Sequence, residues 1–265
     1  MAFLVRNLID NDDITLVQSL GAFDIVEYER DLSVDMASAQ TAYFASKMNV
    51  RRRQAIAKLN NSAVTVQAGA MQWTVGNVSL TSGVKGAGDL LGKMLRSTVT
   101  GESAIKPEYS GSGLVALEPT YKHLLAVDLA DWNGSLVVED GMFLACEATV
   151  QQKLVARSNV SSALAGGEGF FNLALAGQGV VLLESFVPRA ELIEVELHDD
   201  VLKIDGSLAV AWSASLNFTV ERSSKSLLGS MASGEGLVNV YSGTGRVLMS
   251  PVASTSPLLN AVPQA

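Results

Sequence analysis

A short phrase with paired glycines occurs three times in this chain and constrains its fold more than any other feature. The copies begin at Gly101, Gly166 and Gly234 and read GESAIKPEYSGSGLVALEP, GGEGFFNLALAGQGVVLLES and GEGLVNVYSGTGRVLMSP. The paired glycines recur at intervals of 66 residues: Gly111 and Gly113, Gly177 and Gly179, Gly243 and Gly245. A fixed period of this size indicates a unit repeated along the chain. The sequence therefore predicts three copies of one β-rich unit.

The paired glycines stand between strand-like residues. Glycine is needed there for a turn or bulge with positive φ, or where another backbone approaches closely. We interpret them as folding elements and not as ligand-binding residues. A second phrase aligns around Gly69, Gly141 and Gly206, and Asp140 and Asp205 precede two of these glycines. Asp-Gly between strands is typical of a type I′ hairpin turn, which we predict at both places.

Strand patterns dominate from residue 63 onward, with runs rich in valine and leucine separated by Gly, Asn and Asp turns. Such spacing favours a mainly β sandwich or barrel over alternating β and α units. Before residue 63, residues 23–29 alternate like a strand. An alanine-rich stretch then predicts a short helix to about Met48, with Ser33 or Asp35 as its N-cap. We predict that the arginine-rich stretch after the helix forms a strand. We expect one compact body with these parts: an N-terminal strand–helix–strand segment packed on the first repeat (1–60), three β repeats (61–120, 121–185 and 186–252) and a loose C-terminal tail (253–265).

The composition narrows the class of protein. Of 265 residues, 48% are hydrophobic and 17% charged, and the net charge is −8. These values favour a packed globular protein over a disordered one. An acidic chain repels phosphate backbones, so we expect no nucleic-acid partner. We interpret the one dense basic run, Arg51 to Arg53, as a solvated edge and not as a binding patch.

The single cysteine, Cys146, leaves no internal disulfide and no cysteine-based metal site. It lies in an apolar run, where we expect a buried, inert thiol. The first residues lack the pattern of a signal peptide, and no apolar run reaches the roughly 18 residues that span a bilayer. We expect a cytoplasmic protein without a transmembrane segment.

A search for chemistry finds no catalytic, cofactor-binding or metal-binding constellation. The Gly-rich stretch GVKGAGDLLGKML fails both the P-loop and the dinucleotide pattern. No motif links His123 or His198 to a nucleophile, and two histidines without a cysteine pair disfavour a zinc site. One symmetric polar group remains, formed by the glutamates at the same place in each repeat: Glu102, Glu168 and Glu235. These glutamates either accept backbone N–H bonds in a turn, or bind a cation or line a pore.

A Ser- and Ala-rich segment precedes each Gly-Glu, and each carries apolar residues at loosely helical spacing. These residues form a candidate interaction face: Leu90, Leu91, Met94, Val160, Leu164, Leu227, Leu228 and Met231. If the repeats pack around a pseudo-threefold axis, the three segments meet at one end of the molecule. They then either form a patch for self-association, a protein partner or peripheral membrane contact, or plug the end of the core.

The phrases GAMQW, GESAIKPEYSGSG, GGEGFFNLALAGQG and VLKIDGSLAVAW resemble the Altered Inheritance of Mitochondria protein 24 family over about residues 20 to 252. The resemblance implies β-sandwich or distorted jelly-roll units related to the tryptophan RNA-binding attenuator protein, repeated around a pseudo-threefold axis. Fungal members are tied to inner-membrane organisation, and the attenuator protein binds tryptophan and RNA. This chain departs from the attenuator protein because it is acidic and its repeats are fused, so those ligands are not carried over. The resemblance assigns no catalytic residue.

Three functional hypotheses follow. The first is a non-enzymatic scaffold or interaction protein, with a protein partner or self-association. The second is a small-ligand binding module of the attenuator-like fold, for which Trp73, Trp132 and Trp212 are the residues to follow. The third is an enzyme, which would require a buried carboxylate pair with shifted pKa values among the three repeated glutamates.

Overall fold

The computed structural model describes residues 3–31, 33–81, 106–156, 171–222 and 237–253. Strands dominate these residues, as the sequence predicts. One α-helix, α1 (Ala39–Lys47), lies between the second and third strands. The strands are β1 (Ile14–Leu20), β2 (Phe23–Tyr28), β3 (Arg53–Val66), β4 (Met71–Thr81), β5 (Glu108–Leu117), β6 (His123–Asp128), β7 (Ser135–Val138), β8 (Phe143–Glu147), β9 (Val150–Ala156), β10 (Phe171–Gly177), β11 (Val180–Ser185), β12 (Ile193–Asp205), β13 (Ala209–Ser213), β14 (Asn217–Arg222) and β15 (Leu237–Met249).

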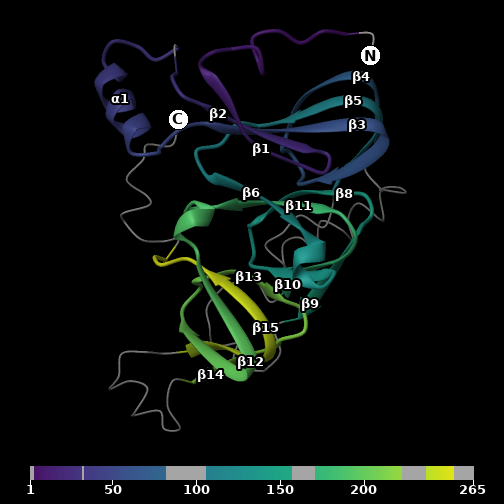
Figure 1. The fold of residues 1–265 in the computed structure, drawn as a ribbon, viewed down its shortest axis with the longest axis vertical. Coiled ribbons are helices and arrows are strands. Elements are labelled where there is room, and N and C mark those ends of the chain that lie inside the picture. Colours follow the sequence, from purple (N-terminus) through teal and green to yellow (C-terminus); the bar gives the residue numbers. More distant parts are fainter. Residues whose placement is uncertain (1–2, 32, 82–105, 157–170, 223–236, 254–265) are drawn as a thin grey trace, which may run out of the picture.

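The strands form two curled antiparallel sheets. In the first sheet, which we call sheet A, the order is β1-β2-β3-β8-β11-β6, with β5 paired to β3 and β4 to β5. In sheet B the order is β12-β15-β13-β7-β10-β9, with β14 paired to β15. Sheet A occupies one half of the long axis and most of sheet B the other (Figure 1). The mainly β fold class is therefore confirmed.

The core follows from the strand sequences. Strands such as β8 and β11 lie between two neighbours and are buried along almost their whole length, which suits their continuous apolar runs. The largest cluster joins both sheets through Leu136, Leu175, Val181 and Leu183. Trp132 belongs to the same cluster, and Trp212 lies in a cluster of sheet B against Tyr241 and Phe218. Trp73, which is only partly buried, packs beside Val26 and Ile56.

One pairing pattern recurs along the chain. β5 lies between β3 and β4, which precede it in sequence. In the last part of the chain, β15 lies between β12 on one side and β13 and β14 on the other. In the middle, β10 pairs with β7 and β9, while β11 pairs with β6 and β8. This pairing pattern is compatible with the threefold repeat, which remains a prediction.

The predicted type I′ hairpins at Asp140-Gly141 and Asp205-Gly206 are wrong. A type I′ turn needs positive φ at both central residues, and only the glycines have it, at 75° and 69°. The strands that these turns connect also do not pair with each other, because a later strand lies between β12 and β13, and β7 and β8 belong to different sheets. The turns therefore redirect the chain and do not close a hairpin.

The glycines of the repeated phrase have the folding role that the sequence predicts. Gly111, Gly177 and Gly243 share positive φ angles of 128°, 119° and 116°. A Cβ at Gly111 would collide with the backbone oxygen of Asn77, and a Cβ at Gly113 with that of Val75. Strands β4 and β5 can therefore come together only because both positions lack a side chain.

The predicted N-terminal helix is confirmed, although it begins later than expected. Its N-cap is Ser38, whose side chain makes no capping bond, and neither Ser33 nor Asp35 holds that position. Asp35 shapes the turn before the helix, because its carboxylate accepts a bond of 2.9 Å from the Ser38 N–H and its carbonyl accepts one of 3.0 Å from the Ala39 N–H. The arginine-rich stretch continues as β3, as predicted.

Candidate functional site

The Arg51–Arg53 run forms an ion-pair network at the side of sheet A. Arg53 is 4% exposed, and its guanidinium lies 2.6 Å from the Glu27 carboxylate. Arg51 pairs with the same carboxylate at 2.8 Å and with Glu29, and Arg52 pairs with Asp31 at 3.0 Å. The expectation of a solvated edge is wrong for Arg53, because the acids of β2 and the loop after it draw the run inward. Sequence reasoning missed these acids because their pairing depends on the register of β2 against β3.

His123, the first residue of β6, lies near this network. Burial and, to a smaller extent, the positive charge of Arg53 lower its pKa to about 4, although Glu27 acts in the opposite direction. Burial also lowers the pKa of Arg53, against the effect of Glu27. The imidazole is therefore neutral at pH 7 and is held in an environment that disfavours its cation.

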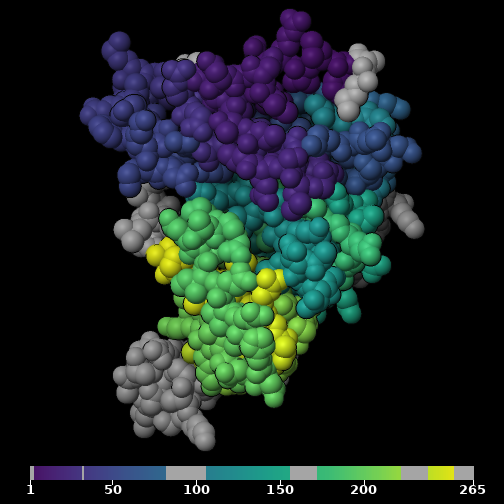
Figure 2. Space-filling view, viewed as in Figure 1, coloured from purple at the N-terminus to yellow at the C-terminus, as the bar shows by residue number. Residues whose placement is uncertain are grey.

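The network also anchors the short helix. Arg53 donates to the carbonyl and side-chain oxygens of Asn49, just beyond α1, at 3.1 and 2.7 Å. Arg51 donates to the carbonyl of Ser46, and the Ser46 hydroxyl donates to the carbonyl of Glu29, both at 3.0 Å. These bonds hold the C-terminal end of α1. The helix itself contains no buried residue, and it stands out at the side of sheet A (Figures 1 and 2).

A cavity of about 530 Å³ separates α1 from the sheet. Its lining includes Ala39, Ala42 and Ala45 of the helix, together with Tyr28 and Tyr121. The Arg52 guanidinium stacks 4.8 Å from the centre of the Tyr28 ring. Burial raises the pKa of Tyr28, an effect that Arg52 opposes and Asp31 reinforces. The sequence signal that could have located this cavity is the alanine spacing, because a helix face of small residues leaves space against its support.

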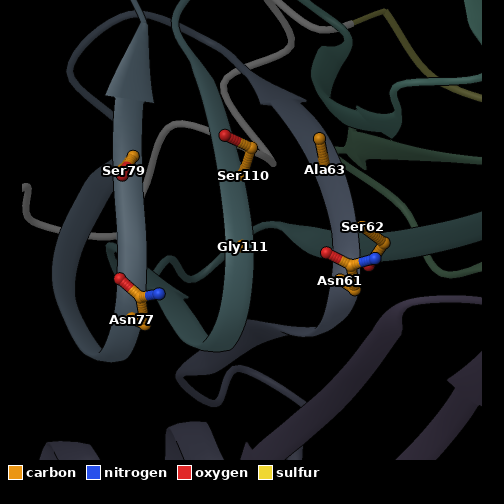
Figure 3. Close-up of a pocket in the computed structure, with 7 residues that line it drawn as sticks. All are labelled: Asn61, Ser62, Ala63, Asn77, Ser79, Ser110 and Gly111. Atoms are coloured by element: carbon orange, nitrogen blue, oxygen red, sulfur yellow. The ribbon is translucent and has the colours of Figure 1, made fainter.

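A second hollow, of about 490 Å³, lies over three neighbouring strands of sheet A (Figure 3). Its lining side chains are small and uncharged: Asn61, Ser62 and Ala63 of β3, Asn77 and Ser79 of β4, and Ser110 and Gly111 of β5. It arises where β3 bulges and Asn61 adopts a positive φ of 50°. Its lining can offer hydrogen bonds to a polar molecule, but it contains no base to activate a nucleophile.

The remaining predicted residues have the following places. The candidate interaction face (Leu90, Leu91, Met94, Val160, Leu164, Leu227, Leu228 and Met231) and the repeated glutamates (Glu102, Glu168 and Glu235) lie outside the described residues. Cys146 is buried, as the sequence predicts, and burial raises the pKa of its thiol to about 12. His198 is exposed on β12. Trp132 and Trp212 are core residues, and neither is among the residues that line the two cavities described above.

Two kinds of feature are absent from the part of the chain that the structure describes. There, no group of three or more His, Cys, Asp or Glu residues is arranged to hold a metal ion. Over the same residues, no helix has the length and apolar character needed to cross a membrane.

Comparison with known proteins decides the family. The family model described as mitochondrial biogenesis AIM24 matches residues 21–252. The chain belongs to the AIM24 family. This AIM24-family chain is 32% identical over 196 residues to an uncharacterized protein of Streptococcus pyogenes serotype M6. The aligned region covers 71% of this chain and 76% of the relative. The resemblance that the sequence phrases indicate is therefore confirmed.

A solved structure supports the fold of the AIM24-family chain. The crystal structure of another Streptococcus pyogenes protein is 27% identical and superposes with a TM-score of 0.58, over 77% of this chain and 90% of that one. Neither relative has a name that states an activity.

Proposed function

We propose that this AIM24-family chain is a non-enzymatic interaction protein that associates with a second copy of itself through the three Ser- and Ala-rich segments. The observation that carries the proposal is the way in which the fold holds the ends of these segments. Thr81 pairs with Glu108, Ala156 with Phe171 and Arg222 with Leu237. Each segment therefore leaves and re-enters the described fold at the end of a two-stranded antiparallel ribbon.

The three ribbons, β4–β5, β9–β10 and β14–β15, support a role in contacts and not in the core. In each, the strand before the segment pairs on one side only among the described residues. Apolar side chains are also exposed close to two of the ribbon ends, with Leu80 58% and Leu154 38% exposed. Leu80 and Leu154 lie just before the first and second segments in the sequence, a placement that suits an interaction surface.

The test is a fourfold substitution in the first and third segments: Leu90→Ser, Leu91→Ser, Leu227→Ser and Leu228→Ser. Sedimentation velocity over a range of protein concentrations measures self-association, and far-UV circular dichroism checks the fold. We expect the wild type to associate and the variant to remain a monomer with an unchanged spectrum.

A matched control carries four serines at exposed apolar positions of described strands: Leu16, Val17, Ile193 and Val201, which are 43% to 51% exposed. This control should associate like the wild type. A wild type that stays monomeric at every concentration, or a segment variant that associates as strongly as the control, contradicts the proposal.

A further inference from the structure

The cavity beneath α1 has the size of a small-molecule site. Its volume of about 530 Å³ lies within the range of roughly 300–1,000 Å³ that ligand pockets occupy. Its walls come from the β2 end, the loop before α1, the helix itself and the start of β3. Its described lining residues do not belong to the segments of the proposed function.

The helix lacks the packing that would explain its stability. α1 has nine residues, none of them buried, and isolated helices shorter than about 12 residues are marginal in water. Helices in proteins are usually stabilised by an apolar face packed on the core. Here the half-buried helix residues that line the cavity are Ala42, Ala45 and Ser46, and all of them are small. An apolar group between the alanines and the tyrosines would supply that packing.

The cavity also offers unmatched positive charge. Lys47 lines it, and among the described residues its one close contact is the ring of Tyr43, at 5.4 Å, with no carboxylate in ion-pair range. Arg52 lines it too, and its Nε–H is buried without an acceptor among the described residues, while Nη2 contacts Asp31 at 3.0 Å. The two lining acids, Glu29 and Asp31, are already paired with Arg51 and Arg52. The charge left for a ligand is therefore positive, although the chain as a whole is acidic.

We propose that this cavity binds a small carboxylic acid with an apolar body. Its carboxylate pairs with Lys47 and Arg52, since arginine offers a planar fork of donors that matches a carboxylate. Its apolar part lies between the alanine face of α1 and the rings of Tyr28 and Tyr121. Binding then adds the packing that α1 lacks and gives the Lys47 ammonium a carboxylate partner.

Isothermal titration calorimetry of the full chain with octanoate tests the proposal. We expect a dissociation constant of about 1 mM or tighter. Acetate, which has the headgroup without the chain, and octyltrimethylammonium, which has the chain with the opposite charge, should each bind at least tenfold more weakly. Octyl phosphate separates a general anion site from a carboxylate site, and we expect it to bind more weakly than octanoate.

Two substitutions on α1 locate the site. Ala42→Trp fills the cavity from the helix and should abolish octanoate binding. Gln40→Trp places the same side chain at an exposed position of α1 that does not line the cavity, and it should bind within twofold of the wild type. Lys47→Gln and Arg52→Gln should each weaken binding about tenfold.

Circular dichroism establishes that each variant is folded, and Lys47→Gln, at an exposed position, decides the charge question if Arg52→Gln does not fold. Absence of octanoate binding at 10-fold above the expected dissociation constant overturns the proposal. So does equal binding of the cationic chain, or unchanged binding by Ala42→Trp.

Discussion

Alanine substitutions at three glycines separate the two reasons for which this fold needs glycine. Gly69 has a φ of 82°, and a Cβ there would meet nothing within 4 Å. Gly113 lies outside the positive-φ region, but its Cβ would collide with the Val75 backbone oxygen. Gly111 combines a φ of 128° with a collision against the Asn77 backbone oxygen. The three positions therefore test backbone strain alone, close approach alone, and both together.

The expected magnitudes follow from these geometries. Positive φ costs a non-glycine residue about 1–2 kcal/mol, and alanine returns about 0.4–1 kcal/mol by restricting the unfolded chain. Gly69→Ala should therefore lose about 0.5–1 kcal/mol. The collisions bring a Cβ inside 3.0 Å of a backbone oxygen, so a strand must shift, and such overpacking costs about 1–3 kcal/mol. We expect Gly113→Ala to lose about 1–2 kcal/mol and Gly111→Ala about 2–4 kcal/mol.

Urea unfolding followed by tryptophan fluorescence measures these losses, because Trp132 and Trp212 are buried and report on the core. The order of the three midpoints matters more than their absolute values. If Gly111→Ala is no less stable than Gly69→Ala, then close approach of β4 and β5 is not the reason for the glycine in the repeated phrase.

Two further predictions concern titratable groups. His123 has a folded-state pKa of about 4, below its ordinary 6.5, so the unfolded chain binds the proton more readily and stability should fall as the pH drops from 6.5 toward 4. His123→Gln, which stays neutral, should show a smaller loss in urea midpoint over that window; an identical pH dependence would contradict the assignment. The pKa of Cys146 is about 12, so the native thiol should resist a thiol-reactive disulfide at pH 8 and react only in denaturant, and rapid reaction of the folded protein would refute the burial that we describe.

Local patterns predicted well the features that depend on neighbouring residues. The strand content, the helix before β3 and the burial of Cys146 follow from apolar periodicity and from the residues adjacent in sequence. The sequence predicts the positions of the turns at Gly141 and Gly206 correctly, but the predicted turn type is wrong. The Asp-Gly rule assumes that the two adjoining strands pair with each other, and here a distant strand takes that place or the chain changes sheet.

The candidate site shows the same division. The sequence shows that Arg51 to Arg53 form a dense basic run. The acids that neutralise this run come from β2 and the following loop. Only the β2–β3 register brings Glu27 within reach of both Arg51 and Arg53. The cavity beneath α1 depends on the distance at which the arginine network holds the helix from the sheet.

By itself, the sequence determined that this chain is an acidic β protein in which glycines recur with a fixed period, because alternation, turn chemistry and composition are local properties of a chain. Only the tertiary structure decided which strands pair, why Gly111 and Gly113 tolerate no side chain, and where a cavity remains. Those outcomes depend on contacts between segments far apart in sequence, such as β4 with β5 or Arg53 with Glu27, and a register shift of one residue would change each of them.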